Sequence, residues 1–377
     1  AAILGRHVAM FNSDSEAMVS ENEGLMPRKE LRAGTLIASV GTMKTYRLVR
    51  MLGTGDSGDV WLCWDVNDSE RRAVKIFWGD VAMDVQRTGW IHRRAEEAVG
   101  CYVPKFYEAS VGQVAEQSDA ECAIIVMQYV DGEDLRSLVL HRPEYLAIPV
   151  AKVILHDVAF ALRRLHRCGL IHRDIKPESI IVARSGYCFL CSFGLTLVLE
   201  ERLPAPSFLP RCGSPLFMSP EMCFSEEDDG YSQYCDKVDV WAFGITACFL
   251  ATGSVPEDDH PECATEDVEY DCPDCEEELT DDESPSVEEI YRRIIENPAP
   301  RLPLAEGIPT PFNDLVARCL ERDPDQRISS DNLPDDGFLW ITAEDRETAS
   351  IFMHLKGARF RLRAAKLTSR NGRAVHR

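Results

Sequence analysis

The residues best suited to chemistry in this sequence are three closely spaced glycines and a lysine that follows them. Gly53, Gly55 and Gly58, followed by Val60, give the pattern G-x-G-x-x-G-x-V. Strand-like runs flank this pattern on both sides, so it predicts a strand–loop–strand hairpin and not the strand-to-helix turn of a dinucleotide-binding motif. Glycines in such a loop let backbone amides approach phosphate oxygens closely. Lys75 lies on the next strand-like run, from which its ammonium group could reach the same phosphates.

Two further segments follow the hairpin. Residues 171–179 read IHRDIKPES and residues 191–195 read CSFGL. With the glycine loop and the lysine, they resemble the motifs of the eukaryotic protein-kinase superfamily in order and spacing. The resemblance covers about residues 46–330, and three later segments extend it: CGSPLFMSPEM at 212–222, DVWAFG at 239–244 and RDPDQRI at 322–328.

The elements that must position these residues divide the chain into a β-rich half and a helix-rich half. Residues 46–77 contain three runs rich in β-branched and aromatic residues, and residues 122–130 form a continuous apolar run of strand length. From residue 150 onward, helical spacing of apolar residues dominates. Together with the resemblance, this order of strand-rich and helix-rich halves predicts an α+β, kinase-like bilobal fold, with a small β-rich lobe and a large helical lobe.

Carried over position by position, the resemblance implies a nucleotide site made largely by the β-rich half. Val60 and Ala73 would frame an adenine ring. Met127 would lie at the gatekeeper position, and residues 128–130 would form the hinge between the lobes. Asp134 is placed to meet a ribose. The three glycines and Lys75 would then face the phosphates.

The resemblance also implies a phosphoryl-transfer site in the helix-rich half. Asp174 would accept or orient the proton of a substrate hydroxyl, and Lys176 would neutralise the transferred phosphoryl group. Asp239 would brace the backbone of the turn that carries Asp174, and Arg327 would pair with Glu221. A structural alternative stays open, in which Asp174 and Lys176 persist only because their turn organises the large lobe.

Two departures from the family pattern predict that this site transfers little or no phosphate. Ser192 stands where the family has a metal-binding Asp, and Ser179 stands where it has a metal-binding Asn. A neutral hydroxyl is a poor ligand for Mg²⁺, which prefers carboxylate and water oxygens. Asp56 and Asp59 add negative charge at the glycine loop, and each would repel a triphosphate by about 1–4 kcal/mol. We therefore expect a pseudokinase with weak or absent ATP binding and without Mg²⁺.

Two other functions remain open from the sequence. Lys75, Asp174 and Lys176 are compatible with an active Ser/Thr kinase that uses metal in an atypical way. A third hypothesis is a switch that binds a nucleotide without turning it over. The glutamate that would pair with Lys75 is Glu96 or Glu97, unless Arg93 or Arg94 occupies its place.

Charge is distributed unevenly along the 377 residues, whose formal net charge is −22. The stretch 257–289 holds 17 acidic residues and no Lys or Arg, whereas the last 22 residues hold 8 Lys or Arg and no acid. We predict an N-terminal extension at 1–44, a small lobe at 45–130, a large lobe at 131–355 with an acidic insert at 257–285, and a basic C-terminal tail at 356–377.

The acidic insert is the part of the chain best suited to bind a protein partner. It predicts a docking surface for a basic partner, a solvated acidic loop, or a contact with the basic tail of the same chain. We expect no nucleic-acid partner, which would need a basic surface; because the acidity is concentrated in the insert, this expectation rests on the kinase-like fold more than on the summed charge. No run approaches the roughly 18–20 apolar residues of a transmembrane segment.

The insert also holds four residues with metal-ligand spacing. His260, Cys263, Cys272 and Cys275 give paired H-x-x-C and C-x-x-C motifs that could hold Zn²⁺, although the short gap between them favours disulfides or free thiols. Cys188 and Cys191 form another C-x-x-C, which we expect to be part of the core because it lies on a strand-like run.

A narrower resemblance concerns the cellular compartment. The N-terminal extension, the 14 cysteines and the altered metal positions resemble the secreted rhoptry-type, bradyzoite pseudokinase-like group of apicomplexan parasites. This resemblance implies secretion into a parasite vacuole or cyst wall. The alternative is a cytoplasmic protein, because the cysteine count alone leaves the compartment open.

Overall fold

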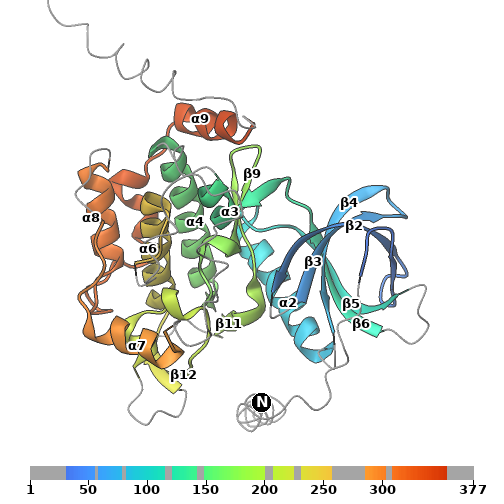
Figure 1. Ribbon diagram of the computed structural model, residues 1–377, viewed down its shortest axis with the longest axis horizontal. Helices are drawn as coiled ribbons and strands as arrows, with labels where there is room; N and C mark the ends of the chain where they lie inside the picture. The colour runs from blue at the N-terminus through green and yellow to red at the C-terminus, as the bar shows by residue number, and fades with distance from the viewer. Residues whose placement is uncertain are drawn as a thin grey trace, which may run out of the picture. The chain divides into compact units, whose positions relative to one another are not determined.

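The computed structural model describes two compact units, each formed by two stretches of the chain (Figure 1). The first unit takes the described residues up to 86 and residues 108–126. The second unit takes residues 87–107 and the described residues from 127 onward. The described residues are 31–55, 58–78, 82–114, 121–141, 148–199, 207–224, 231–256, 285–302 and 308–354.

Most of the first unit is a closed barrel in the order β1-β2-β3-β4-β6-β5. Alternation explains the barrel, since Tyr46 and Leu48 on one strand and Val74 and Ile76 on another point inward and are almost completely buried. The strands are β1 Leu36–Ser39, β2 Thr45–Gly55, β3 Gly58–Asp65, β4 Glu70–Phe77, β5 Phe106–Val114 and β6 Glu121–Gln128.

The short strand β1 closes the barrel. It pairs with β2 on one side and with β5 on the other, both antiparallel. Ile37 pairs with Tyr46 and Val114 in the two registers, and its side chain is fully buried. This strand belongs to the segment expected as an N-terminal extension. Its burial shows that the described end of that segment is part of the folded unit, while residues 1–30 lie outside the described residues.

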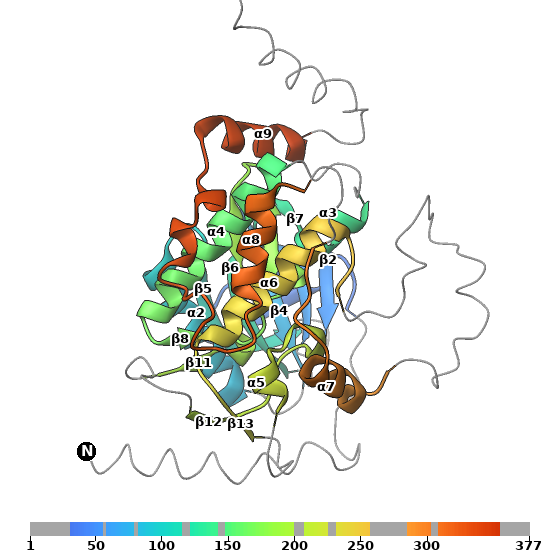
Figure 2. The ribbon, with the colours of Figure 1, turned by 90° about the vertical axis from the view of Figure 1, so that its left-hand side faces the viewer.

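The second unit is mainly helical (Figure 2). Its helices are α3 Leu135–His141, α4 Ile148–Arg167, α5 Pro220–Cys223, α6 Lys237–Thr252, α7 Val287–Glu296, α8 Thr310–Cys319 and α9 Ala343–His354, and α2 Ala82–Val99 runs into it from the first unit. Its strands form small sheets: β7 Gly132–Asp134 with β9 Ile180–Ala183 and β10 Cys188–Leu190, β8 Leu170–Ile171 with β11 Leu197–Val198, and β12 Ser207–Pro210 with β13 Tyr231–Tyr234.

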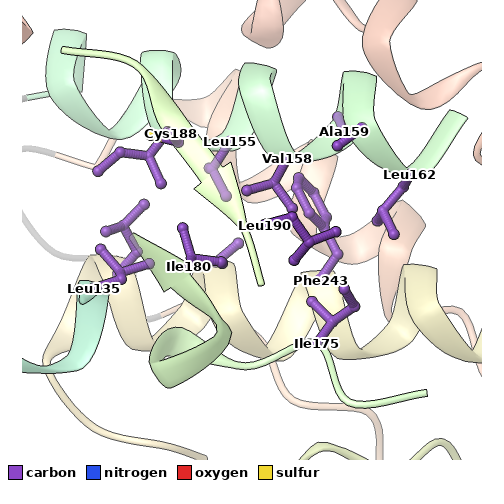
Figure 3. Close-up of a cluster of buried hydrophobic side chains, with 14 of the residues drawn as sticks. Leu135, Leu155, Val158, Ala159, Leu162, Ile175, Ile180, Cys188, Leu190 and Phe243 are labelled. Atoms are coloured by element: carbon purple, nitrogen blue, oxygen red, sulfur yellow. The ribbon is translucent and has the colours of Figure 1, made fainter. Parts of the chain in front are cut away.

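The core of the second unit lies between α4 and α6. Helix α4 is amphipathic and presents Val158 and Leu162 to this core. Helix α6 is apolar on all sides, as expected for a helix buried all round, and Phe243 is fully buried. Figure 3 shows these side chains together with Ile175, which follows Asp174, and Leu190, the last residue of β10. This core therefore anchors the turn that carries Asp174.

Helix α9 is held on α4 by a pair that is remote in sequence. The guanidinium of Arg346 donates to both carboxylate oxygens of Asp157 at 2.6 and 2.7 Å. Asp157 also accepts from the backbone N–H of Cys188 at 3.0 Å. Figures 1 and 2 both show α9 beside the end of α4. This bond network joins α9 to the sheet that leads to Ser192.

The grouping of the chain differs from the predicted domain boundaries around α2, and residues 127–130 of the predicted small lobe also group with the second unit. Residues 87–107, which carry most of α2, were expected in the small lobe and instead group with the second unit. Contacts explain the grouping: Arg164 donates to the carbonyl of Ala98 at 2.5 Å, and Arg87 donates to the carbonyl of Thr196 at 3.2 Å. Sequence patterns do not report such long-range contacts.

Several predictions fall partly or wholly outside the described residues. The acidic insert beyond residue 256, the four candidate zinc ligands His260, Cys263, Cys272 and Cys275, and the basic tail are among them. All eleven cysteines in the described part of the chain are free thiols, so no disulfide forms among them. No described helix is long and apolar enough to span a membrane.

Candidate functional site

The glycine loop lies in the first unit as a strand–loop–strand hairpin. Gly53 pairs with Val60 and Gly55 with Gly58 across β2 and β3. Gly58 has φ +120, and a Cβ there would collide with the carbonyl oxygen of Ile76, so this position requires glycine. The tip of the hairpin, which includes Asp56, lies outside the described residues.

The predicted adenine-facing and phosphate-facing side chains share one face of the barrel. Val60 is directly opposite Lys75, and Leu62 is directly opposite Ala73. Because side chains alternate along a strand, all four lie on the same side of the sheet. The ammonium of Lys75 lies 5.2 Å from the centroid of the Phe77 ring. The hairpin is closed by a hydrogen bond from the Thr54 hydroxyl to Asp59 Oδ1 at 2.6 Å.

The acidic and basic residues of α2 make local contacts in the second unit. The Glu96 carboxylate accepts a hydrogen bond from the backbone N–H of Phe106 at 2.8 Å. The Arg93 guanidinium lies 5.1 Å from the centroid of the Phe106 ring, and that of Arg94 lies 5.0 Å from the centroid of Trp90. Glu96 therefore helps to fix the start of β5.

Asp134, the predicted ribose contact, lies at the end of β7 and caps α3. Its Oδ1 accepts from the backbone N–H of Ser137 at 2.9 Å, the usual bond of an aspartate at a helix start. Met127 lies half-buried near the end of β6. Beside it, the backbone N–H of Gln128 donates to the carbonyl of Lys105 at 2.8 Å.

Asp239 holds the turn that precedes Asp174. Its two carboxylate oxygens accept from the backbone N–H groups of His172 and Arg173, both at 2.8 Å. His166 Nε2 lies 2.7 Å from the same carboxylate. Burial alone would raise the pKa of Asp239, but the hydrogen bonds from His166 and the backbone outweigh it and lower the pKa. Asp239 is therefore a charged anchor in the core of the second unit.

Asp174 and Lys176 meet at a third residue, Ser214. The Ser214 hydroxyl donates to Asp174 Oδ1 at 3.0 Å, and Lys176 Nζ donates to the Ser214 oxygen at 2.6 Å. Lys176 Nζ also lies 3.2 Å from Asp174 Oδ1. Sequence reasoning missed Ser214, although it lies in the segment 212–222 that resembles the family. Its partners are 40 and 38 residues away, so only the fold brings them together.

An aromatic cluster sets the position of Ser192. The ring of the next residue, Phe193, lies 5.3 Å from the rings of both His92 and His172, measured between centroids. Burial lowers the pKa of both histidines, so both are neutral at pH 7. Ser192 has φ 71 in the left-handed region, and its side chain is exposed. The buried Phe193 thus presents Ser192 on a fixed turn.

The two serines at the family's metal positions do not form a site that fits Mg²⁺. Ser179 is 0% exposed, and its hydroxyl is already bonded to the backbone of Lys176, as donor at 2.8 Å and acceptor at 3.0 Å. Ser192 supplies only one neutral oxygen. A hard divalent cation needs several oxygen ligands, preferably including carboxylates. Within the described residues, no cluster of three His, Cys, Asp or Glu side chains could replace them.

The C-x-x-C pair beside Ser192 is made of protonated thiols. Cys188 is buried on β10, and burial raises its pKa well above the ordinary value. Burial also raises the pKa of Cys191 to about 12. A thiol that stays protonated at neutral pH is a poor nucleophile and metal ligand. These residues support packing around the site and not chemistry in it.

Comparison with known proteins gives one family and many relatives. A family described as the protein kinase domain matches residues 46–339. Serine/threonine-protein kinase PknB of Mycobacterium leprae is 26% identical over 285 residues, which are 76% of this chain and 41% of that protein. Serine/threonine-protein kinase cds1 of Schizosaccharomyces pombe is 26% identical over 311 residues, which are 80% of this chain and 60% of that protein.

A third relative matches a shorter region with higher identity. Serine/threonine-protein kinase TAO1-B of Xenopus laevis is 30% identical over 224 residues, which are 56% of this chain and 20% of that protein. The chain thus spans between 20% and 60% of the length of these three relatives. The family match over residues 46–339 includes the glycine loop, Asp174 and Ser192.

Proposed function

Because the chain belongs to the protein kinase family, we propose that it acts as a pseudokinase, a member that binds or regulates a protein partner with little or no phosphoryl transfer. The proposal depends mainly on Ser179. Its hydroxyl is 0% exposed and bonded to the backbone of Lys176 through both a donor and an acceptor contact. The hydroxyl of Ser179 could bind a metal only by giving up both of these hydrogen bonds, which stabilise the local backbone.

Ser192 supports the proposal from the other side of the site. Phosphoryl transfer depends on neutralising the charge that spreads over the transferred group, and Mg²⁺ normally supplies that neutralisation. With a hydroxyl in place of a carboxylate at Ser192, the second protein ligand is also lost. Asp174 then has no activated phosphoryl group to act on. In this reading, Asp174, Lys176 and Ser214 stabilise the turn and the segment that covers it.

The glycine hairpin is also poorly suited to hold a triphosphate. Asp59 lies next to Val60 and is held in the hairpin by Thr54 at 2.6 Å. Its carboxylate adds negative charge to the hairpin to which the family brings phosphates, and like charges a few ångströms apart cost about 1–4 kcal/mol in partly exposed surroundings. We propose that ATP binding is weak or absent.

An active Ser/Thr kinase is the second candidate, and one observation favours it. The carboxylate of Asp174 and the ammonium of Lys176 lie 3.2 Å apart and share Ser214, an arrangement that could still orient a substrate hydroxyl. The relatives named above are serine/threonine-protein kinases by name. A nucleotide-binding switch without turnover is a third candidate, favoured by the glycine hairpin and Lys75 alone.

A binding titration separates the non-binding pseudokinase from the switch. The melting temperature of the protein is measured against ATP concentration, with EDTA, with Mg²⁺ and with Mn²⁺. The proposal expects no saturable shift in any of the three series. A saturable rise of about 3 °C, the shift expected from roughly 1–2 kcal/mol of ligand stabilisation, would instead favour the switch or the active kinase.

A phosphotransfer assay separates the pseudokinase from the active kinase. Labelled ATP is incubated with the protein and a mixture of generic protein substrates, in parallel with the Asp174→Ala variant. The proposal expects the same background incorporation for both proteins. Incorporation by the parent that Asp174→Ala abolishes would establish the active kinase. The Asp174→Ala variant is the essential control, because phosphate incorporation by contaminating kinases is the same in both samples.

The partner and the compartment are also proposals. We propose that the acidic insert, residues 257–285, recruits a basic protein partner, because it concentrates negative charge on one connection between helices. Capture experiments with the full chain and with a variant that lacks the insert test this, and equal recovery of every partner would contradict it. Secretion and kinship with the rhoptry-type group remain proposals; they rest on the extension, the cysteine count and the two serines.

A further inference from the structure

Tyr234 links three parts of the second unit that are far apart in sequence. Its hydroxyl donates to the carbonyl oxygen of Pro210 at 2.7 Å. The same oxygen accepts a hydrogen bond from Nη1 of Arg173 at 3.1 Å. Tyr234 is only 1% exposed, and burial raises the pKa of its phenol to about 12, so the hydroxyl keeps its proton at neutral pH. The phenol therefore serves as donor and acceptor at the same time.

Arg173 is held by hydrogen bonds from both its backbone and its guanidinium group. Its backbone N–H is held by Asp239, and its backbone lies in the left-handed region with φ 65. Its Nε donates to the carbonyl of Leu195 at 2.7 Å, three residues after Ser192. Through Nη1 it reaches Tyr234. The side chain thus connects the turn before Asp174 with the segment after Ser192 and with β13.

The segment that Tyr234 holds is paired as a strand. Residues 207–210 form β12, which runs antiparallel to β13 with Ser207 opposite Tyr234 and Pro210 opposite Tyr231. Strand β13 is itself fixed, because the hydroxyl of Ser232 donates to the carbonyl of Met222 in α5 at 2.9 Å. A two-stranded ribbon is marginal on its own, so the ribbon depends on such tertiary contacts.

The far end of the same segment is fixed to the Asp174 turn. Gly213 has φ +109, and a Cβ there would collide with the carbonyl oxygen of Arg173. The next residue, Ser214, is bonded to Asp174 and Lys176. Residues 207–214 are therefore held at Pro210 by Tyr234 and at Ser214 by the Asp174 turn.

We propose that Tyr234 is a built-in latch that keeps residues 207–214 in place over the Asp174 turn without phosphorylation. Segments next to an active site are often ordered by a phosphate that pairs with an arginine, because the phosphate supplies charge and several acceptors. Here the phenol oxygen of Tyr234 already accepts from Arg173, and its proton already goes to the segment. The latch does not depend on whether the protein transfers phosphate, so it stands apart from the proposed function.

Hydrogen–deuterium exchange of the unphosphorylated full chain tests the latch. Tyr234→Phe keeps the ring but removes both hydrogen bonds, and amides within 207–214 are expected to exchange about tenfold faster, equivalent to about 1.4 kcal/mol. Tyr187→Phe removes a phenol hydroxyl at an exposed position elsewhere in the second unit and is expected to leave that exchange within about twofold. Unchanged exchange in Tyr234→Phe would overturn the proposal.

Two more measurements keep the test decisive. If Tyr234→Phe does not fold, Arg173→Gln provides the readout. It removes the bonds from Arg173 to Tyr234 and to Leu195 but leaves the bond from Tyr234 to Pro210, and we expect a smaller but measurable increase in the same peptides. The parent protein is also compared before and after phosphatase treatment, with intact mass confirming the loss of any phosphate. Slow exchange should persist after treatment. Protection that appears only in phosphorylated protein would show that a phosphate, and not Tyr234, is the latch.

Discussion

Arg327 and Glu221 form a two-point ion pair across 106 residues of sequence, with Nη1–Oε1 at 2.7 Å and Nη2–Oε2 at 3.0 Å. The arginine side chain is completely buried and also donates to the carbonyl of Lys237 at 3.0 Å. The pair was expected from the sequence, because the two motifs resemble family motifs. Through Arg327, it links Glu221 in α5 to the first residue of α6.

Removal of the arginine should destabilise the protein strongly. Arg327→Met leaves the Glu221 carboxylate without its cation, and breaking one side of a buried pair costs about 3–5 kcal/mol. Arg167→Ala is the matched control, because the Arg167–Asp331 pair lies on the surface with Arg167 60% exposed. Exposed pairs contribute about 0–1 kcal/mol. Urea unfolding measures both free energies, and similar losses in the two variants would contradict the prediction.

Asp239 should make the stability of the protein depend on acid. Its pKa is lower in the folded chain than the ordinary value of 3.8, so the unfolded chain binds a proton more readily. This contribution to stability is therefore complete above the unfolded pKa and is lost as pH falls through the folded pKa. Asp239→Asn should be less stable by roughly 1–3 kcal/mol at pH 7 and should lack this part of the loss below about pH 4.

Unfolding by urea between pH 3 and pH 7 measures this dependence. Asp325→Asn, at an exposed position, is the control and should change the free energy of unfolding by less than about 0.5 kcal/mol. If Asp239→Asn and the parent lost stability in parallel on acidification, the carboxylate of Asp239 would not be the group responsible.

Gly244 should be required for the contact between α6 and α8. A Cβ at this position would lie 2.9 Å from the Cβ of Cys319 and 2.7 Å from a methyl carbon of Leu320. Alanine favours a helix by about 1 kcal/mol over glycine, but the overlap should outweigh that gain and leave Gly244→Ala less stable by about 1–3 kcal/mol. Gly337→Ala enters open space and should change stability little. A more stable Gly244→Ala variant would show that the helices can separate without cost.

Reactivity of the thiols should follow exposure and pKa. Cys101 and Cys168 are exposed, whereas burial raises the pKa of Cys191 and Cys248 to about 12. The thiolate is the reactive form, so iodoacetamide at pH 7.5 should label the first two cysteines well before the second two. Mass spectrometry of peptides after short labelling checks the order. Labelling of Cys191 as fast as that of Cys168 would mean that the turn before Ser192 opens readily.

Restoring the family's residues at both altered positions should restore metal-dependent nucleotide binding, if these positions alone removed it. In the Ser179→Asn, Ser192→Asp double variant, saturating ATP with Mg²⁺ should raise the melting temperature by about 2–4 °C, and ATP with EDTA should not. Replacing Ser192→Asp by Ser192→Asn gives a control of nearly equal size without the charge. An equal shift in that control would show that the carboxylate is not the deciding group.

Local sequence was sufficient for much of this fold. The glycine pattern predicted the β2–β3 hairpin, since the positive φ of Gly58 and its close approach to the carbonyl oxygen of Ile76 require glycine. Apolar periodicity predicted helices from residue 150 onward, among them α4. These features depend on residues within a few positions of one another. The two serines, Ser179 and Ser192, were visible in the same way because motifs of fixed spacing surround them.

The tertiary structure decided which polar groups meet outside the pairs that the motifs predicted. Ser214 reaches Asp174 across 40 residues, Tyr234 reaches Arg173 across 61, and Arg346 reaches Asp157 across 189. No periodicity or motif spacing reports such pairs, because each hydrogen bond depends on the packing of several elements at once. The sequence therefore determined the kind of fold and the residue types at its site. Folding determined that the hydroxyl of Ser179 turns toward the backbone and that Tyr234 closes the segment over Asp174.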